Sequence, residues 1–204
     1  MGGLARGRVT EKGRPLIAIS GTPGTGKSAV AEALGPRLGL PVIALNELVR
    51  ERGLGRGSYD GSMVVDEEGV HEALKAIDRP SVVEGHFADL APADRVSRLF
   101  VLRCRPRELA DRLAPRDYSL EKLRENILAE GLDTCLIDAV TALGEERVSE
   151  ADTTRRCPED VATELEKVLR GERTPPVPGR FSHLEEALEI VNGLGGVGPD
   201  VMLH

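Results

Sequence analysis

The sequence predicts an α/β fold of three layers (α/β/α), in which helices cover both faces of a five-stranded parallel sheet. Two observations lead to this prediction. Short apolar runs alternate along the chain with longer helical segments, a pattern typical of parallel sheets with right-handed crossovers. In addition, residues 21–28 read GTPGTGKS. This is a complete G-x-x-x-x-G-K-S phosphate-binding loop, and it lies between an apolar run and a helical segment, as the motif requires.

Four expected strands are apolar runs rich in Val, Ile and Leu that are too short for helices, at residues 16–20, 40–44, 81–84 and 98–103. A short fifth strand is expected at residues 147–150. Between and after them lie segments with helical periodicity or with helix start and stop signals. These expected helices cover about 27–35, 46–52, 67–77, 106–114, 119–143, 158–170 and 181–191.

The boundaries of the first helices follow from single residues. The first helix begins at Lys27, and we expect Gly35 and Pro36 to stop or kink it, because proline lacks a backbone N–H. Asn46 can cap the next helix through its side-chain oxygen. The glycine-rich stretch 53–61 should then break that helix.

Residues 119–143 carry the strongest helical pattern, with apolar residues close to a 3.6-residue period. These residues are at positions 120, 123, 127, 128, 132, 136, 140 and 143. Ser119 begins the segment without a capping-box glutamate three residues later, although Glu121 suits the helix dipole. Pro106 and Pro158 each suit the first turn of their own helix.

The ends of the chain differ in composition from its middle. Residues 1–15 form a loose lead-in, and residues 16–171 form the α/β domain. Three prolines stiffen the linker 171–179, so residues 172–204 are expected to be a proline-rich linker and a C-terminal helix. This tail shows no catalytic feature, and we expect it to pack against the core or a partner. No internal repeat is visible.

Charge and aromatic content restrict the class of partner. The net charge is −7 and only 2% of the residues are aromatic, so basic surface and stacking rings for nucleic acid are scarce. We therefore expect no direct nucleic-acid binding. A local basic pocket is nevertheless predicted by a run of arginines at positions 103, 105, 107, 112 and 116.

Cysteine spacing and hydropathy indicate the compartment. Cys104, Cys135 and Cys157 are far apart and lack the spacing of zinc ligands. We interpret them as reduced thiols of a cytoplasmic protein. No apolar run approaches about 18 residues and no signal-peptide pattern is present, so no membrane association is expected.

Three separate regions should meet at one edge of the sheet, because ligands bind at the carboxyl ends of parallel strands. They are the phosphate loop, Glu84 with His86 after the third strand, and the start of the arginine-rich segment. In the loop, glycines let backbone N–H groups surround phosphate oxygens. Lys27 would reach the β- and γ-phosphates, and the Ser28 hydroxyl would hold Mg²⁺.

Glu84 and His86 are open to two interpretations. A carboxylate at the end of an apolar strand is costly to bury without a purpose, so Glu84 could hold Mg²⁺ through water. His86 could orient the attacking group or a water, although a lone histidine is equally a structural residue. In the arginine run, Arg105 and Arg107 suit a solvated helix face.

The motifs together resemble the adenylate kinase isoenzyme 6 family, which includes archaeal members usually called putative adenylate kinases. The resembling stretches are residues 21–28, 46–50, 65–68, 82–87, 101–106 and 112–119, with Glu125, Asn126, Ile127 and Glu130 in the helix that follows. The resemblance covers roughly residues 15–170. Asp117 departs from it, because the family usually has glycine there, and both ends of the chain lie outside it.

The resemblance implies the fold of a P-loop NTPase and the activity of a small nucleoside monophosphate kinase. Such an enzyme transfers the γ-phosphate of ATP to AMP with Mg²⁺ and has some ATPase activity. Residues 45–68 would bind the monophosphate, and residues 114–124 would form a short lid. Eukaryotic relatives also bind a small-subunit ribosomal protein during ribosome maturation, so such a partner is an extrapolated expectation.

The implied site residues fall into four groups, the last of which, Arg50 and Asp66, would bind the monophosphate. The ATP-binding residues are Gly24, Gly26, Lys27, Ser28, Ala29 and Arg116; the catalytic residues are Lys27, Glu84, His86 and Arg112; the metal-binding residues are Ser28 and Glu84. Arg112 and Arg116 are four residues apart, so both should face the same phosphates. Arg50 would hold the acceptor's α-phosphate, or be an ordinary surface arginine. Asp66 would shape the acceptor pocket, or simply cap the following helix.

Three functions remain open from the sequence. The first is an ATP:nucleoside monophosphate phosphotransferase that prefers AMP. The second is an ATPase that assists small-subunit assembly, an alternative favoured by the short lid, which excludes water poorly. The third is a P-loop kinase for another small metabolite. ADP formation measured with and without AMP distinguishes them.

Overall fold

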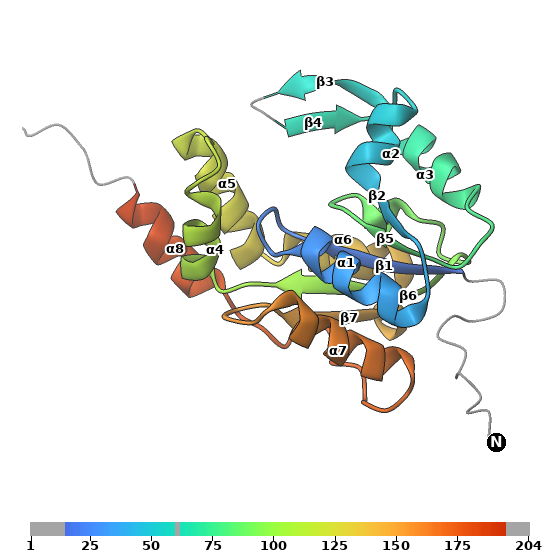
Figure 1. Ribbon diagram of the computed structural model, residues 1–204. Coiled ribbons are helices and arrows are strands. Elements are labelled where there is room, and N and C mark those ends of the chain that lie inside the picture. Colours follow the sequence, from blue (N-terminus) through green and yellow to red (C-terminus); the bar gives the residue numbers. More distant parts are fainter. Residues whose placement is uncertain (1–14, 60–61, 195–204) are drawn as a thin grey trace, which may run out of the picture.

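A central parallel sheet organises the structure, a computed structural model that describes residues 15–59 and 62–194 (Figure 1). The sheet has five strands in the order β2-β5-β1-β6-β7. Their bounds are β1 Leu16–Gly21, β2 Val42–Ala44, β5 Ser81–Glu84, β6 Val96–Arg103 and β7 Val148–Asp152. All four pairings are parallel. β1 lies at the centre, so the loop that follows it lies in the middle of the sheet's carboxyl edge.

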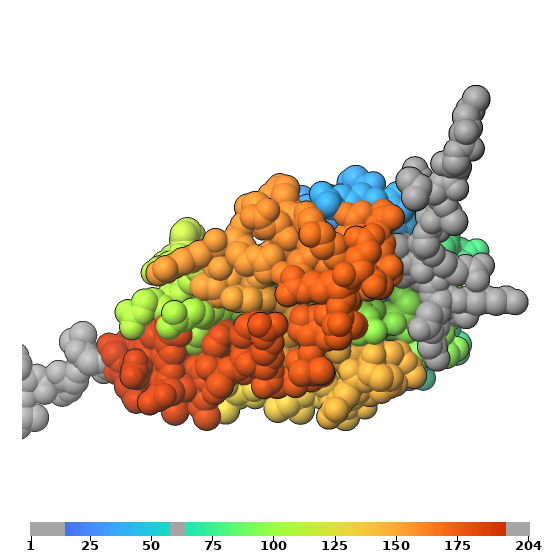
Figure 2. All heavy atoms as spheres, turned by 90° about the horizontal axis from the view of Figure 1, so that it is seen from below, coloured from blue at the N-terminus to red at the C-terminus, as the bar shows by residue number. Residues whose placement is uncertain are grey.

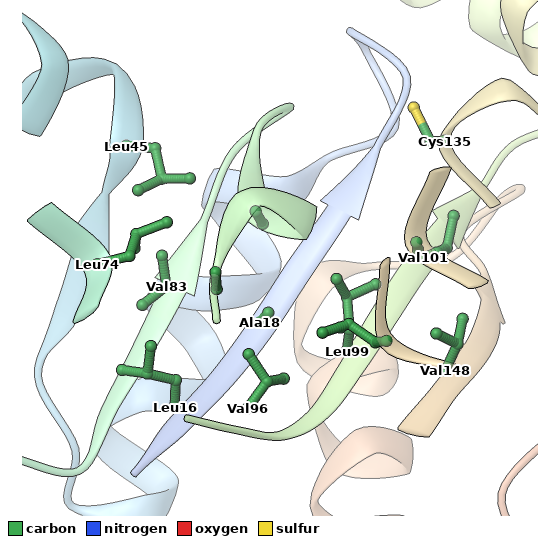
Figure 3. Close-up of a cluster of buried hydrophobic side chains, with 14 of the residues drawn as sticks. Leu16, Ala18, Leu45, Leu74, Val83, Val96, Leu99, Val101, Cys135 and Val148 are labelled. Carbon is green, nitrogen blue, oxygen red and sulfur yellow. The ribbon is translucent and has the colours of Figure 1, made fainter. Parts of the chain in front are cut away.

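Helices cover both faces of the sheet. On one face α1 (Lys27–Leu38) and α7 (Pro158–Leu169) pack on a cluster that includes Ile17 and Ile19 of β1. On the other face α6 (Thr134–Leu143), α2 (Leu45–Glu51) and α3 (Glu67–Lys75) pack on Leu16, Ala18 and their neighbours (Figure 3). Alternate residues of β1 therefore serve opposite faces, as the period of a strand requires. The predicted three-layer fold is confirmed.

The stretch 53–61 does more than interrupt a helix. Residues of it form β3 (Gly55–Tyr59), which pairs antiparallel with β4 (Ser62–Val65) as a separate two-stranded sheet. Figure 1 shows this hairpin beside α2 and α3, away from the main sheet. The sequence prediction missed it because its glycines obscure the strand pattern. Gly57 has φ 130°, and the pairing register shifts between Gly55 and Gly57.

Two predicted helix boundaries are wrong. α1 continues through Pro36 and ends at Gly39, which adopts a left-handed conformation (φ 67°) and donates to the Gly35 and Pro36 carbonyls. Proline removes one intrahelical hydrogen bond there, and the glycine provides the stop. Asn46 does not cap α2, because the N-cap is Ala44 and no side chain caps that end.

The long helical pattern at 119–143 is two helices. α5 (Leu120–Gly131) ends before Asp133, whose left-handed backbone (φ 58°) turns the chain into α6. Ser119 caps α5 by accepting a hydrogen bond from the Lys122 amide. The periodic pattern survives the break because α5 packs on helices while α6 packs on the sheet. Periodicity alone therefore could not reveal the turn.

The remaining elements in the described part of the chain are two helices and two short 3₁₀ turns. α4 (Pro106–Leu113) begins at a proline as predicted, and two short 3₁₀ turns lie at Ala88–Leu90 (η1) and Glu145–Arg147 (η2). α8 (Leu184–Gly193) packs against α5 and α4 (Figure 1). Most of the predicted lead-in at 1–15 and most of the glycine-rich end at 193–198 lie outside the described residues.

Candidate active site

The phosphate loop connects β1 to α1 and is held in a fixed shape by its surroundings. Gly24 and Gly26 have positive φ values of 93° and 91°. A Cβ atom on Gly21 would lie 2.6 Å from the Leu102 carbonyl oxygen. Within the loop, the Thr25 amide and hydroxyl donate to the Thr22 carbonyl at 3.2 and 2.8 Å. Glycine is thus required both by backbone conformation and by close packing on β6.

Lys27 folds back over this loop. Its Nζ donates to the carbonyl oxygens of Gly21 at 2.8 Å and Thr22 at 3.1 Å. Burial lowers the pKa of the ammonium, while the nearby Glu84 carboxylate opposes that shift. The ammonium is therefore fixed at the mouth of the loop, next to the α1 N-terminus, where anions are favoured.

Ser28 and Glu84 come together from different elements. The Ser28 hydroxyl donates to Glu84 Oε1 at 3.1 Å, and Glu84 is the last residue of β5. Burial raises the pKa of Glu84, while the hydrogen bond from Ser28 and the charge of Lys27 partly oppose that rise. A hydroxyl beside a carboxylate is a set of hard oxygen donors, which fits Mg²⁺. Within the described residues no group of three His, Cys, Asp or Glu side chains forms a cation cluster.

His86 lies two residues beyond β5. Its Nδ1 is 3.6 Å from Cys135 Sγ, and its ring packs edge-on against Phe87 with centroids 5.3 Å apart. Burial lowers the pKa of His86, and the Lys27 charge lowers it further. Burial also raises the pKa of Cys135 to about 11. At neutral pH the site thus holds a neutral imidazole beside a neutral thiol.

One cavity of about 780 Å³ unites most of the predicted residues. Eight of them line it: Gly24, Gly26, Lys27, Ser28, Ala29, Glu84, His86 and Arg116. They come from the loop, α1, the end of β5 and the connection between α4 and α5. This is the convergence expected at the carboxyl edge of the sheet.

The two arginines expected to act together are separated. Arg116 lines the cavity, whereas Arg112 does not. Arg112 donates to the Gly24 carbonyl at 3.4 Å, to Glu108 at 2.6 Å and to the Thr153 carbonyl at 2.7 Å. Arg112 therefore contacts the phosphate loop through the Gly24 carbonyl, outside the cavity. The spacing of four residues did not put both on one face because the helix ends at Leu113.

Arg50 and Asp66 also lie outside the cavity wall. Asp66 accepts a hydrogen bond from the Gly69 amide at 3.4 Å and forms an ion pair with Arg56 at 2.9 Å. That geometry corresponds to the helix-capping interpretation. Arg50 is exposed on α2, although Asn46, one turn earlier on the same helix, lines the cavity.

The predicted basic pocket does not form, because its arginines have different partners. Arg103 is 1% exposed and pairs with Glu130 at 2.9 Å, with Glu150 at 2.6 Å and with Asp133. The exposed Arg105 and Arg107 both face Glu186 on α8. Only Arg116 of the original run reaches the cavity.

Several cavity residues were absent from the predicted site. They are Pro23, Asn46, Phe87, Tyr118, Lys122, Glu125, Asn126, Ala129 and Thr134. Asn126 is 5% exposed and its Nδ2 has no hydrogen-bond partner, so a buried donor is left unsatisfied at the cavity. Asn126 is three residues from both Leu123 and Ala129, and a polar residue on that face of α5 is the signal that could have identified it.

Comparison with known proteins places this geometry in context. Residues 17–133, more than half of the chain, match a family described as an AAA domain. A protein of Natronomonas pharaonis named "Putative adenylate kinase" is 45% identical over 163 residues, covering 79% of this chain and 94% of the relative. A protein of the same name from Methanothermobacter thermautotrophicus is 41% identical over 166 residues, covering 80% and 95%.

Solved structures share the fold. Shikimate kinase from Acinetobacter baumannii in complex with shikimate gives a TM-score of 0.52 at 17% identity, covering 79% of this chain and 96% of that one. An uncharacterized protein from Eubacterium ventriosum gives 0.51 at 16% identity, covering 79% and 100%. At such identities the likeness shows the fold alone. Among residues 15–59 and 62–194, no helix is long and apolar enough to cross a membrane.

Proposed function

This chain belongs to the AAA domain family and to the group of archaeal proteins named putative adenylate kinase, and we propose that it transfers the γ-phosphoryl group of ATP to AMP with Mg²⁺ as cofactor. The single observation that carries the proposal is the shared cavity. Lys27, Ser28, Glu84, His86 and Arg116 reach it from separate segments of the chain. Phosphoryl transfer depends on such positioning and on charge neutralisation more than on covalent chemistry.

The donor phosphates would lie on the loop. Backbone N–H groups of residues 24–29 and the Lys27 ammonium would bind the β- and γ-oxygens, and Arg116 would cover them with its planar guanidinium. Ser28 and Glu84 would hold Mg²⁺, directly or through water. When bound, the cation would supply neutralisation of the phosphate charge.

His86 would act at the acceptor side. Burial and the Lys27 charge lower the pKa of His86, so its ring is neutral. A neutral ring nitrogen can accept a hydrogen bond from water or from a protonated group of the phosphoryl acceptor without adding charge to the site. Arg112 would contribute indirectly, because its bonds to Gly24 and Thr153 hold the loop in shape.

The acceptor nucleotide would bind beside α2 and the β3–β4 hairpin, within residues 45–68. Asn46 lines the cavity, and Arg50 is one turn further along the same helix, so a closing movement of α2 would bring Arg50 to the acceptor's α-phosphate. Residues 114–124 would form a short lid that includes Arg116 and Tyr118. Because a short lid excludes water poorly, we also propose intrinsic ATP hydrolysis.

A coupled assay of ADP formation tests this function. We expect ADP production to rise strongly on addition of AMP, with two ADP formed for each ATP consumed, and Lys27→Ala to abolish it. If the rate of ADP formation did not change on addition of AMP, CMP or dAMP, the kinase proposal would be wrong. A role in small-subunit assembly finds no support among the relatives named above, and we do not propose it. The free cysteines favour a reducing compartment, the cytosol.

A further inference from the structure

The C-terminal segment packs closely against the helices beside the site. Figure 2 shows it, in orange to red, crossing one face of the molecule from α7 to α8. α8 lies on α5 and α4, the two helices on either side of the lid connection. A Cβ atom on Gly131 of α5 would lie 2.5 Å from Ala187 Cβ of α8, so the two helices touch at the backbone. The segment is thus an integral part of the packed structure.

His183, immediately before α8, reaches a buried carboxylate. It is 8% exposed, and its Nδ1 lies 3.3 Å from Glu130 Oε1. The same oxygen accepts hydrogen bonds from Arg103 Nε at 2.9 Å and from the Cys104 amide at 3.1 Å. Burial raises the pKa of Glu130, but the bonds from His183, Arg103 and Thr22 outweigh burial and lower it. An ionised Glu130 can only accept hydrogen bonds, so His183 Nδ1 must carry the hydrogen of this bond.

The other oxygen of Glu130 holds the phosphate loop. Thr22 donates its hydroxyl to Glu130 Oε2 at 2.7 Å, across 108 residues of sequence. The Thr22 carbonyl in turn accepts hydrogen bonds from Lys27 Nζ and from both donors of Thr25. Four residues therefore connect the C-terminal segment to the lysine of the loop: His183, Glu130, Thr22 and Lys27.

A second anchor comes from the same segment. The Arg180 amide donates to Glu150 Oε2 at 2.8 Å, while Glu150 Oε1 accepts from Arg103 at 2.6 Å. The segment thus donates to both of the buried glutamates that flank Arg103. Charge-assisted bonds of this kind are about twice as strong as neutral ones, and a buried carboxylate that loses one is left underpaired.

We propose that the C-terminal segment is part of the support of the phosphate loop, and that His183 is a positioning residue that acts on Thr22 and Lys27 through Glu130. Without His183, the Glu130 carboxylate binds a water molecule or moves toward Arg103. The hydrogen bond from the Thr22 hydroxyl to Glu130 Oε2 then lengthens. The loop then loses the fixed shape in which its amides and Lys27 face one phosphate group. The kinetic part of this inference rests on the proposed function, whereas the shape of the empty loop does not.

Amide hydrogen exchange of the full chain without nucleotide tests the inference independently of activity. We compare His183→Ala with His183→Asn, whose side-chain N–H occupies the place of Nδ1. Glu185→Gln, at an exposed position of α8, is the matched control. His183→Ala should lower the protection of amides in residues 21–28 about tenfold, as expected for one lost charge-assisted bond. His183→Asn and Glu185→Gln should leave it unchanged.

Kinetics and a double mutant complete the test. His183→Ala should lower kcat/KM for ATP about tenfold, His183→Asn should restore it, and combination with Thr22→Val should add little, because both changes break one path. The inference is overturned if loop protection is unchanged in His183→Ala, if protection falls equally throughout the domain, or if the two substitutions are additive. A wild-type protein without AMP-dependent turnover but with the predicted exchange pattern would refute the proposed function and leave this inference standing.

Discussion

Replacement of Arg103 should show how strongly the buried ion network stabilises the fold. Arg103 is 1% exposed, and its guanidinium donates to Glu130 at 2.9 Å, to Glu150 at 2.6 Å, to the Glu130 carbonyl at 3.0 Å and to Asp133. Arg103→Met keeps most of the apolar volume and removes every one of these donors. Glu130 and Glu150 are 2% and 1% exposed, so water cannot readily replace the lost partner.

The size of the destabilisation depends on the hydrogen bonds that each carboxylate retains in Arg103→Met. Glu130 retains its bonds from Thr22, Cys104 and His183, and Glu150 retains the Arg180 amide. Breaking a buried pair by removing one partner typically costs about 3–5 kcal/mol. We expect a loss of this size in the free energy of unfolding.

Urea denaturation followed by circular dichroism measures the change. Arg107→Met is the matched control, because the Arg107 side chain is 72% exposed and its ion pair with Glu186 spans 3.9 Å. An exposed pair contributes about 0–1 kcal/mol. If Arg103→Met lowered the midpoint no more than Arg107→Met, this network would not be a major stabilising element.

The same comparison has a pH dependence with a definite sign. Burial opposes ionisation of Glu130, but the bonds from His183, Arg103 and Thr22 outweigh it, so the folded-state pKa is lowered. A carboxyl with a lowered folded pKa contributes stability that is present above its unfolded pKa and lost as pH falls through the folded one. The difference between wild type and Arg103→Met should therefore be largest near neutrality and shrink below roughly pH 4.

Three other perturbations test separate parts of the structure. His86→Gly should lower kcat more than about tenfold while ATP affinity, measured by calorimetry, changes little, since in the proposed mechanism the ring acts on the acceptor side; equal losses in both would contradict a catalytic role. Gly24→Ala should cost about 1–3 kcal/mol in urea denaturation and weaken ATP binding, because φ is 93° and the new Cβ would lie 2.8 Å from Leu109 and 2.9 Å from Leu113; unchanged stability would contradict this. Burial raises the pKa of Asp89 to about 6, so its contribution to stability is greatest below its ordinary pKa and lost as pH rises through about 6. Asp89→Asn should consequently raise the melting temperature at pH 8 more than at pH 4, and an equal shift at both would refute the assignment.

Local sequence patterns predicted the layers but not the interruptions within them. The apolar runs placed four strands of the main sheet to within a few residues, because strands buried on both faces are largely apolar. The fifth strand, β7, was expected at residues 147–150, although it contains the polar residues Ser149, Glu150 and Asp152. The break at Asp133 was missed because both α5 and α6 need a buried face at the same helical spacing. The β3–β4 hairpin was missed because glycine at position 57 supports a bulge as well as a loop.

The sequence by itself determined the parallel sheet, the phosphate loop and the meeting of Glu84 and His86 with that loop. The succession of apolar and helical segments along the chain and the spacing of the motif indicate these features, and both are local properties of the chain. Only the tertiary structure decided the roles of the charged residues. Arg103 and Arg116 belong to one run of arginines, yet one is buried among carboxylates 27 and 47 residues away and the other lines the cavity. The partner of a charge is chosen by packing between distant segments, and no local pattern encodes that choice.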